Sequence, residues 1–495
     1  MIEAGEAANL RDPALRDSSL FRQQVCIDGR WQDADGGATL AVHNPATGAL
    51  LGAAPLCGAA ETRRAIEAAD RALPAWRALT AAARAKLLRR WFELVLEHQE
   101  DLARLMTLEQ GKPLAEARGE ITYAASFIEW FAEEARRVYG DIMPGHQSDK
   151  RILVIKQPIG VTAAITPWNF PSAMLTRKAA PALAAGCTMV IKPASQTPFS
   201  ALALVELAQR AGIPAGVLNI VTGSAVQIGG ELTGNPLVRK LSFTGSTEIG
   251  RQLMAQCAKD IKKVSLELGG NAPFIVFDDA DLEAAVQGAL VSKFRNNGQT
   301  CVCANRLYVQ EGIYDAFAAR FREAVSQLRV GNGLEEGISL GPLIDARALL
   351  KVQEHIADAL SLGARLTLGG GVHSSGGNFF EPTILEDVPQ SALLVREETF
   401  GPLAPLLRFG DEAEVIAMAN ATEFGLASYF YTRDLGRVFR VAEALECGIV
   451  GVNTGLISTE TAPFGGVKSS GIGREGSKYG IEEYLEIKYV CVSGL

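Results

Sequence analysis

The sequence predicts an α/β protein built on parallel sheets, and three observations lead to that prediction. From Ile159 onward, strand-like and helix-like segments alternate, as they do in a parallel sheet with helices on both faces. The alternation resumes from Phe274 to about Val450, which indicates a second α/β unit. The chain has 495 residues, 48% of them hydrophobic, so it can bury a large core in two or three domains.

The first third of the chain is expected to be helical after a short extended start. Apolar residues recur at three- and four-residue spacing from Thr62 to Leu73 and from Ala81 to Met106, a pattern that predicts two amphipathic helices. Gly111 ends the second of them. A third helix is expected over Leu114–Tyr139, and the segment Asp141–Gln157 that follows it has the pattern of a hairpin.

Strands are expected throughout the alternating region, each separated from the next by enough residues for a crossover helix. They are Ile159–Thr166, Thr188–Lys192, Val217–Val221, Val238–Phe243 and Lys263–Leu268. Ligands of such folds bind at the carboxyl ends of the strands. The last residues, Glu483–Val492, form a further expected strand. Few residues follow it to provide a partner, so we expect it to join the sheet of another subunit.

Charge and cysteine content exclude several classes of protein. The chain has 48 Lys and Arg against 56 Asp and Glu, a formal charge of −8, which opposes nucleic-acid binding. No apolar run approaches the about 20 residues that a bilayer span needs, and Met1–Arg11 lacks the pattern of a secretory signal. The 8 cysteines and 5 histidines are scattered. They predict neither a disulfide scaffold nor a metal site, so we expect a cytoplasmic protein.

Two glycine-containing segments are candidates for a phosphate site. Gly471–Gly476 matches the dinucleotide pattern G-x-G-x-x-G, but too few residues follow it for a helix, a second strand and an acidic residue, so we interpret it as a chance match. In the segment 243–250, an expected strand ends and a helix opens at Gly245 and Ser246. Free backbone N–H groups there would favour a pyrophosphate, although an ordinary capped helix fits the same pattern.

Three further segments carry candidate catalytic side chains. Cys301 lies in a polar, glycine-containing loop, where a thiol is more reactive than in an apolar run, unless it is one of two loop thiols without a role. Glu267 ends an apolar strand, so burial would raise its pKa and make it a base, unless Lys262 or Lys263 pairs with it. Asn169, between aromatic residues and prolines, can direct an amide N–H toward an oxyanion or merely cap a turn.

Together these segments resemble the aldehyde dehydrogenase superfamily, and the likeness extends from about residue 24 to residue 492. Its signatures occur in the family's order: Pro-Trp-Asn-Phe-Pro at 167–171, Leu-Glu-Leu-Gly-Gly at 266–270, Gly-Gln-Thr-Cys at 298–301 and Glu-Thr-Phe-Gly-Pro at 398–402. Agreement of all of them by chance is negligible. The alternatives above therefore lose most of their weight.

The resemblance implies the aldehyde dehydrogenase fold. Its parts would be a Rossmann-like cofactor-binding domain (1–134 and 158–266), an α/β catalytic domain (267–455), a return segment to the cofactor domain (456–479) and a small β oligomerisation arm (135–157 and 480–495). A homodimer or a homotetramer, a dimer of dimers, also follows from the family. The β segments of the arm would add to the catalytic sheet of a neighbouring subunit.

The resemblance also implies a role for each candidate residue. Cys301 would attack the aldehyde, and Asn169 with the backbone N–H of Cys301 would stabilise the oxyanion. Hydride transfer to the nicotinamide would leave a thioester, and Glu267 would activate the water that hydrolyses it. Relatives that transfer the acyl group to coenzyme A lack that base. Glu398 would hold the nicotinamide ribose, and Phe400 would pack near the ring.

The remaining implied cofactor contacts are Thr166, Pro167, Trp168, Lys192, Ser195, Gly245 and Ser246. Ser195 stands where a glutamate is common in relatives that prefer NAD. A carboxylate there would repel a 2′-phosphate, whereas Ser195 with Lys192 can accept one. We therefore expect NADP to be accepted well, with NAD possible as the second cofactor.

Three residues resemble the carboxylate-binding positions of succinate-semialdehyde dehydrogenases: Arg177, Arg295 and Ser458. The implied substrate is succinate semialdehyde, oriented by its far carboxylate. Glutarate semialdehyde stays open, because one CH₂ contributes only about 1–3 kcal/mol of discrimination. A general aliphatic aldehyde dehydrogenase is a further alternative.

A second cysteine follows the candidate nucleophile at a spacing of two residues. Cys301 and Cys303 could close into a disulfide under oxidants and switch the enzyme off, or Cys303 could simply line the pocket. A thiol redox sensor without turnover, on the same scaffold, is the alternative from a different functional class. The intact Glu267 and Asn169 oppose it.

Overall fold

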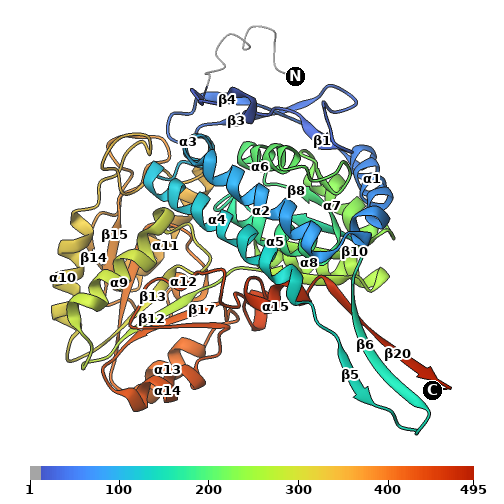
Figure 1. Ribbon diagram of the computed structural model, residues 1–495. Coiled ribbons are helices and arrows are strands. Elements are labelled where there is room, and N and C mark those ends of the chain that lie inside the picture. The colour runs from blue at the N-terminus through green and yellow to red at the C-terminus, as the bar shows by residue number, and fades with distance from the viewer. Residues whose placement is uncertain (1–12, 495) are drawn as a thin grey trace.

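The structure, a computed structural model, describes residues 13–494. The N-terminal stretch in which we expect no secretory signal lies outside the described residues. Figure 1 shows two sheet-containing parts side by side and a narrow arm that projects away from both. Across the described stretch 13–494, none of the helices combines the length and the apolar character that a membrane crossing requires.

The first part is an eight-stranded sheet whose central strands are parallel, as the sequence predicts. In spatial order its strands are β19 (Gly471–Ile472), β11 (Lys263–Glu267), β10 (Val238–Thr244), β7 (Val161–Ile165), β8 (Thr188–Lys192), β9 (Leu218–Ile220), β1 (Val25–Ile27) and β2 (Arg30–Gln32). The edge strands β1, β2 and β19 are antiparallel. They come from the two ends of the chain, outside the predicted alternation.

Helices cover both faces of this sheet, because alternate residues of its strands point in opposite directions. Met189 and Ile191 of β8 pack into one apolar cluster, and Val190 packs into the cluster on the other face. The helices of this part are α1 (Ala59–Ala78), α2 (Ala81–Glu97), α3 (Gln99–Gln110), α4 (Leu114–Glu134), α5 (Ala173–Ala185), α6 (Pro198–Arg210), α7 (Ala225–Gly234) and α8 (Thr247–Cys257).

The predicted helix Ala81–Met106 is wrong as a single element. The structure breaks it at His98, which ends α2 and begins α3 with a non-helical backbone. Glu100 and Asp101 lie in the first turn of α3, where negative side chains favour a new helix start. The apolar periodicity continues across the break, so the pattern alone does not reveal it.

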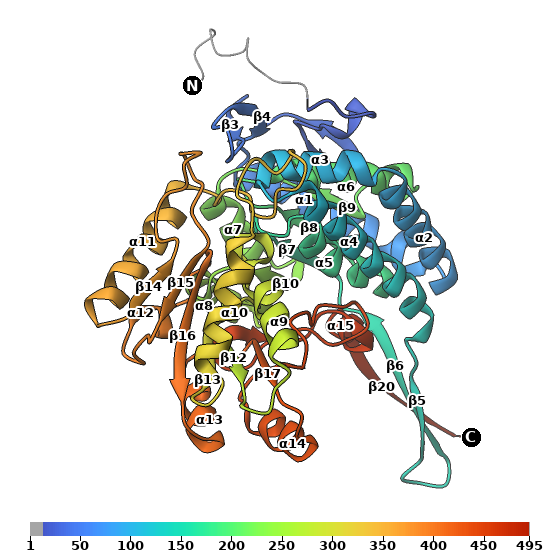
Figure 2. The same cartoon turned by 90° about the vertical axis from the view of Figure 1, so that its left-hand side faces the viewer.

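The second part is a seven-stranded sheet that is parallel except for one edge pair. In spatial order its strands are β14 (Arg365–Leu368), β15 (Thr383–Glu386), β16 (Leu403–Phe409), β13 (Ala304–Gln310), β12 (Ala272–Val276), β17 (Ala427–Tyr431) and β18 (Ile449–Val452). Its helices are α9 (Leu282–Phe294), α10 (Tyr314–Ser326), α11 (Ala346–Ser361), α12 (Leu393–Arg396), α13 (Glu412–Asn420) and α14 (Leu435–Ala444). Figure 2 looks onto α9 and α10, which pack on the face that Phe274 and Val276 of β12 present.

The two sheets meet with opposite strand ends, which corrects the expectation that ligand sites lie only at carboxyl ends. In the first sheet, β7, β10 and β11 end toward the junction at Ile165, Thr244 and Glu267. In the second sheet, it is the amino ends of β13 and β16 that follow Cys301 and Phe400. The rule that ligands bind at the carboxyl ends of the strands therefore holds for the first sheet alone.

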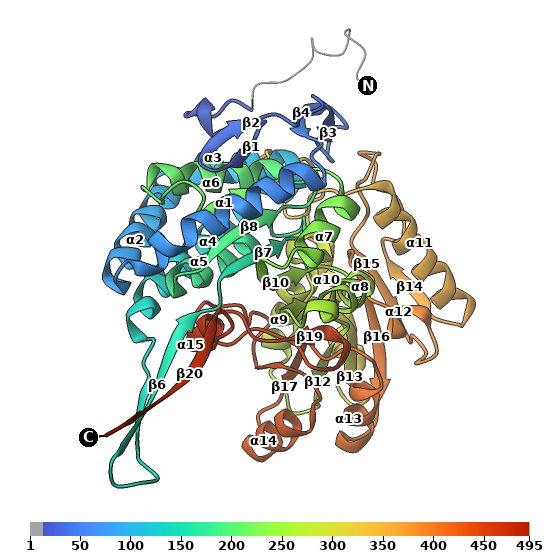
Figure 3. The same ribbon diagram turned by 90° about the vertical axis from the view of Figure 1, so that its right-hand side faces the viewer.

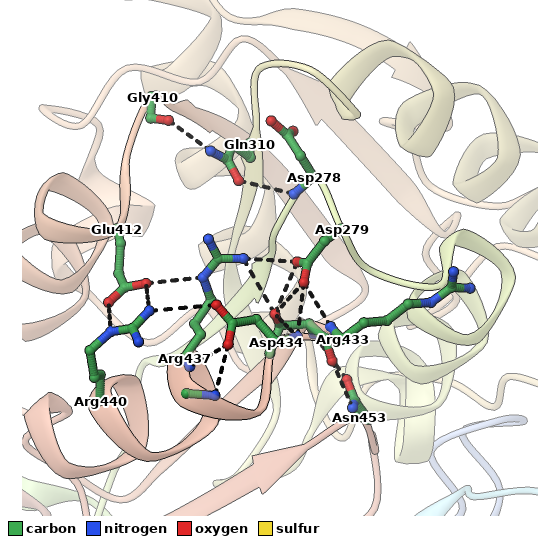
Figure 4. A network of polar contacts seen from close by, with 12 residues as sticks. Asp278, Asp279, Gln310, Gly410, Glu412, Arg433, Asp434, Arg437, Arg440 and Asn453 are labelled. Carbon is green, nitrogen blue, oxygen red and sulfur yellow. Dashed lines mark hydrogen bonds and ion pairs between the residues drawn. The ribbon is translucent and has the colours of Figure 1, made fainter.

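The carboxyl end of the second sheet is closed by a network of charged side chains (Figure 4). Asp279, just after β12, accepts a hydrogen bond from the backbone N–H of Arg433 at 2.9 Å and from Nη1 of Arg437 at 2.9 Å. Glu412 pairs with Arg437 and Arg440. These ion pairs join the segment after β12 to the starts of α13 and α14.

The arm is a three-stranded antiparallel sheet that projects from the first part (Figure 3). The predicted hairpin is confirmed as β5 (Asp141–Pro144) and β6 (Lys150–Pro158), and the C-terminal strand β20 (Leu485–Ser493) pairs with β6 of its own chain. The second edge of β20 has no strand beside it within residues 13–494. Pairing with another subunit stays a prediction.

A few short elements complete the chain. They are the hairpin β3 (Thr39–His43) and β4 (Leu50–Pro55), the short helix α15 (Ser477–Glu482), and the 3₁₀ turns η2 (Ser18–Leu20), η3 (Ala135–Arg137), η4 (Ala258–Asp260), η5 (Arg295–Gly298) and η6 (Lys468–Ser470).

Candidate active site

A cavity of about 220 Å³ at the junction of the two sheets brings the sequence signatures together. Its walls come from the segments after β7, β10 and β11 and from the loops before β13 and β16. The lining residues are Pro167, Trp168, Asn169, Phe170, Met174, Thr244, Gly245, Ser246, Leu268, Gly269, Cys301, Glu398 and Phe400. Residues far apart in the sequence thus line one cavity.

Cys301 lies in a tight turn directly before β13. The backbone N–H of Cys303 donates to the carbonyl of Thr300 at 3.0 Å, which closes this turn. Gly298 has φ +75°, and a Cβ there would lie 2.1 Å from the carbonyl oxygen of Gly401, so only glycine fits. Burial raises the pKa of the Cys301 thiol to about 12. The resting thiol is therefore protonated and needs a base.

Asn169 follows β7 and is almost completely buried. Its Nδ2 donates to the carbonyl of Gln299 at 3.0 Å, which leaves its second amide hydrogen free. Its own carbonyl accepts from Nζ of Lys112 at 2.7 Å and from Nδ2 of Asn296 at 3.0 Å. Hydrogen bonds therefore hold both the side-chain amide and the main-chain carbonyl of Asn169. Asn169 lines the same cavity as Cys301.

Glu267 is the last residue of β11 and is also buried. Its Oε2 has no hydrogen-bond partner among residues 13–494. Burial raises its pKa well above the ordinary value, and the charge of Glu475 raises it further. Lys262 and Lys263, the alternative partners, donate to main-chain carbonyl groups elsewhere. The raised pKa makes Glu267 a stronger base than an exposed glutamate.

Glu475 belongs to the segment Gly471–Gly476 that matches the dinucleotide pattern. In the structure, Glu475 follows an antiparallel strand and precedes a six-residue helix. This arrangement is not that of a dinucleotide motif. The buried carboxylate of Glu475 lies 3.0 Å from Nε of Arg177 and accepts a hydrogen bond from Nζ of Lys178. Sequence reasoning missed Glu475 and Lys178, since nothing local marks residues that meet across such a separation.

The predicted cofactor residues surround the same cavity or lie at the next strand end. Lys192 ends β8; its Nζ contacts only the carbonyl of Pro193, at 3.2 Å among described residues, and burial lowers its pKa to about 8. Ser195 follows, half-buried. The hydroxyl of Thr166 is buried without a hydrogen-bond partner in the described part of the chain. Ser246 caps α8 without a side-chain bond, so its hydroxyl does not occupy the first N–H groups of that helix.

Glu398 and Phe400 close the cavity from the second sheet. Oε1 of Glu398 accepts from the backbone N–H of Gly270 at 3.2 Å, and burial raises its pKa to about 7. Phe400 meets Trp168 edge to face, with ring centroids 5.6 Å apart. An aromatic wall, a carboxylate for a ribose and an under-bonded lysine form a donor set that fits a nicotinamide dinucleotide.

A second cavity, of about 610 Å³, shares Phe170 with the first. Arg295 and Ser458 line it, and the guanidinium of Arg295 lies 4.8 Å from the ring of Phe170. Arg295 has no ion pair within the described chain. Arg177 does not line this cavity; it is buried between Phe464 and the carboxylate described above. The structure therefore brings two of the three predicted carboxylate-binding residues together.

Tyr123 of α4 is a residue of this second cavity that sequence reasoning missed. Its hydroxyl is buried without a hydrogen-bond partner among the described residues. Burial raises its pKa, and the charges of Arg177 and Arg295 oppose that rise. This hydroxyl, which also lies beside Ser458, is in the field of both arginines, and this links Arg177 electrostatically to the cavity that it does not line.

Cys303 is buried, and its Sγ donates to the carbonyl of Lys293 at 3.1 Å. It does not line the cavity that holds Cys301. The interpretation of Cys303 as a pocket-lining side chain is therefore wrong for this cavity. The disulfide with Cys301 stays a prediction.

Comparisons with known proteins agree with this geometry. The model of the aldehyde dehydrogenase family matches residues 31–490. The chain is 75% identical to a glutarate-semialdehyde dehydrogenase of Pseudomonas aeruginosa over 97% of this chain and 100% of the relative. It is 74% identical to the succinate-semialdehyde dehydrogenase (NADP+) GabD of Escherichia coli, over 97% and 99%.

A solved structure described as an NADP-dependent enzyme of E. coli superposes with a TM-score of 0.96. It has 74% sequence identity, and the match covers 97% of this chain and 100% of that one. The family match over nearly the whole length, together with a cavity in which the family's signatures meet, shows that this chain belongs to the aldehyde dehydrogenase family and is an oxidoreductase.

Proposed function

We propose that this enzyme oxidises succinate semialdehyde to succinate and transfers the hydride to NADP, with NAD as a weaker alternative. The single observation that carries the substrate class is the guanidinium of Arg295, which has no ion pair among residues 13–494, in a cavity that adjoins the space around Cys301. Glu116 lines the same cavity and interacts with Arg295 only through its charge. An aldehyde that reaches Cys301 from this side would bring its far end to Arg295 and Ser458. A carboxylate at that end would be the negatively charged partner of the Arg295 guanidinium.

In the proposed reaction, Glu267 takes the proton of the Cys301 thiol and passes it to solvent, while Sγ attacks the aldehyde carbon and forms a thiohemiacetal. The free N–H of Asn169 and the backbone N–H of Cys301 donate to its oxyanion. A bound nicotinamide would supply the acceptor for the hydride of that carbon, and Cys301 would then carry a thioester. Glu267 then takes a proton from the water that attacks the thioester, and the acid is released. The loss of hydride and the addition of water balance the conversion of an aldehyde into a carboxylic acid.

The cofactor would lie across the carboxyl ends of β7, β8 and β10. Glu398 would hold the nicotinamide ribose, and Phe400 with Trp168 would wall the ring. Lys192 and Ser195 would meet the 2′-phosphate of NADP, which agrees with the NADP dependence named for GabD of E. coli and for the solved E. coli structure. The domains are proposed with the same boundaries as above, and the arm is proposed to mediate a homodimer or homotetramer.

Glutarate semialdehyde is the second candidate substrate, because a relative with 75% identity carries that name. It has the same two functional groups with one more methylene between them. The anion pocket described above would accept either, so chain length has to be measured.

The test compares initial rates of NADPH formation with succinate semialdehyde, glutarate semialdehyde and uncharged butanal, repeated with NAD. We expect kcat/KM for a carboxylate-bearing aldehyde to exceed that for butanal by at least about 10²-fold, since a site built for a charged group rejects an analogue that lacks it. Arg295→Met should remove most of this preference. Arg347→Met, at an exposed arginine paired with Asp345, is the matched control. Equal rates with butanal would contradict the proposed substrate class but not the proposed role of Cys301.

A further inference from the structure

We propose that Lys112 is a positioning residue that holds Asn169 in the geometry its oxyanion contact needs; this inference rests on the role of Asn169 in the proposed function. Lys112 lies in the loop between α3 and α4 and is only 2% exposed. Its Nζ donates to the carbonyl of Asn169 at 2.7 Å and to Oε2 of Glu120 at 2.5 Å. It also lies 4.0 Å from the ring centroid of Phe170.

Glu120 completes the grip on the same segment. Its Oε1 accepts hydrogen bonds from the backbone N–H of Ser172 at 3.0 Å and of Ala173 at 3.2 Å, at the start of α5. Lys112 therefore fixes the carbonyl side of residue 169, and Glu120 fixes the amide groups that follow. The segment 169–173 is thus bonded to one buried ion pair at the carbonyl of Asn169 and at the N–H groups of Ser172 and Ala173.

The same loop also reaches the segment that carries the nucleophile. Nε2 of Gln110 donates to Oδ1 of Asn296 at 3.1 Å, and Nδ2 of Asn296 donates both to the carbonyl of Asn169 and to that of Gln299. The Asn169 side chain donates to that carbonyl of Gln299 as well. The two proposed oxyanion donors, the amide of Asn169 and the backbone N–H of Cys301, are thus positioned against a common loop.

Stability alone does not explain a buried pair at this position. Removing a lysine and a glutamate from water costs free energy that their attraction often fails to offset, and apolar residues of similar size are frequently as stable. Oxyanion donors, however, must lie 2.7–3.1 Å from the developing charge. A displacement of about 1 Å can cost about 10²-fold in rate. A rigid charged support at the base of Asn169 meets that requirement.

The readout should be free of the cofactor and of the carboxylate pocket, because Lys112 also lines the second cavity. Hydrolysis of p-nitrophenyl acetate serves, since attack by Cys301 on this uncharged ester forms the same kind of oxyanion and needs no NADP. Four full-length proteins form a double-mutant cycle: the parent, Lys112→Met, Asn169→Ala and the double variant. In the protein that retains Asn169, Lys112→Met should lower kcat by about 10- to 100-fold. In the Asn169→Ala background, the same change should lower kcat by less than about threefold.

Equal losses in both backgrounds would overturn the inference and leave the proposed function intact. An Asn169→Ala variant with unchanged rate would overturn both, because the oxyanion role itself would fail. Lys262→Met is the matched control, since Lys262 is another buried lysine that donates to main-chain carbonyl groups; it should lose thermal stability with kcat retained. If Lys112→Met does not fold, Glu120→Gln replaces it in the cycle, with a loss of about three- to tenfold that again depends on Asn169.

Discussion

Glu475 acts on Glu267 through its charge, and it is itself held ionised by neighbouring cations. Burial alone would raise the pKa of Glu475, but Lys178 and Arg177 outweigh burial and lower it. The persistent negative charge then adds to burial in raising the pKa of Glu267. The proposed base is thus tuned by a carboxylate from the segment 471–476, which the sequence marks only as a false dinucleotide motif.

Replacing Glu475 by Gln should make Glu267 a stronger acid. The change removes a like charge and leaves the two cations facing Glu267, so the ionised form of Glu267 is favoured and its pKa falls. Glu267 must be ionised to accept a proton, and the acidic limb of kcat against pH should therefore move down by about one unit. Glu483→Gln, at a partly exposed carboxylate bonded to Ser265, is the control. If the acidic limb of kcat against pH does not move, a group other than Glu267 sets its pKa.

The thiol of Cys301 should react slowly near neutral pH in the cofactor-free enzyme. Burial raises its pKa to about 12, and the thiolate is the nucleophile. Alkylation by iodoacetamide should therefore rise about tenfold per pH unit from pH 7 to 10 without a plateau, because the thiolate fraction grows tenfold per unit below the pKa. Mass spectrometry of the Cys301 peptide measures it, with exposed Cys491 as the internal reference. A plateau near pH 7 or 8 would contradict a raised thiol pKa at Cys301.

Binding of NADP should weaken above about pH 8. Burial lowers the pKa of Lys192 to about 8, so the lysine is protonated below that pH and loses its charge above it. A 2′-phosphate needs the charge and a 2′-hydroxyl does not. The Kd of NADP should rise by up to about tenfold per pH unit above pH 8 while that of NAD stays flat.

A substitution at Ser195 tests the same assignment at fixed pH. Ser195→Glu should weaken NADP by at least about tenfold, because a carboxylate repels the phosphate, and it should spare NAD. Ser195→Ala controls for loss of the hydroxyl. Fluorescence titration of each variant with each cofactor gives the Kd values. Unchanged NADP affinity in Ser195→Glu would remove Ser195 from the cofactor site.

Local patterns in the sequence are sufficient for the parallel strands of the first sheet, but not for its antiparallel edge strands or for the polar framework of the site. The apolar run Thr188–Lys192 predicts β8 to the residue, because a strand covered on both faces needs a continuous apolar run. Lys112 donates to a carbonyl 57 positions away, and Lys178 meets Glu475 across 297 positions. Periodicity carries no information about such pairs, since each residue by itself has the pattern of a solvated charge.

Oxidants should inactivate the enzyme reversibly through Cys303. The turn closed at Thr300 shortens the path between Cys301 and Cys303 compared with an extended strand, and Cys303 would have to give up its bond to the carbonyl of Lys293. Hydrogen peroxide would oxidise the two thiols to one disulfide and be reduced to water, which removes the nucleophile. Activity should return fully with dithiothreitol.

The variant Cys303→Ala isolates this step, because it retains Cys301 and removes only the resolving thiol. Without a neighbour, the sulfenic acid of Cys301 should proceed to sulfinic acid, so peroxide inactivation should become irreversible. Cys447→Ala, at a cysteine of intermediate exposure elsewhere in the fold, is the control and should behave like the parent. Recovery of Cys303→Ala to the same extent as the parent would exclude the disulfide and leave Cys303 as a packed thiol bonded to Lys293.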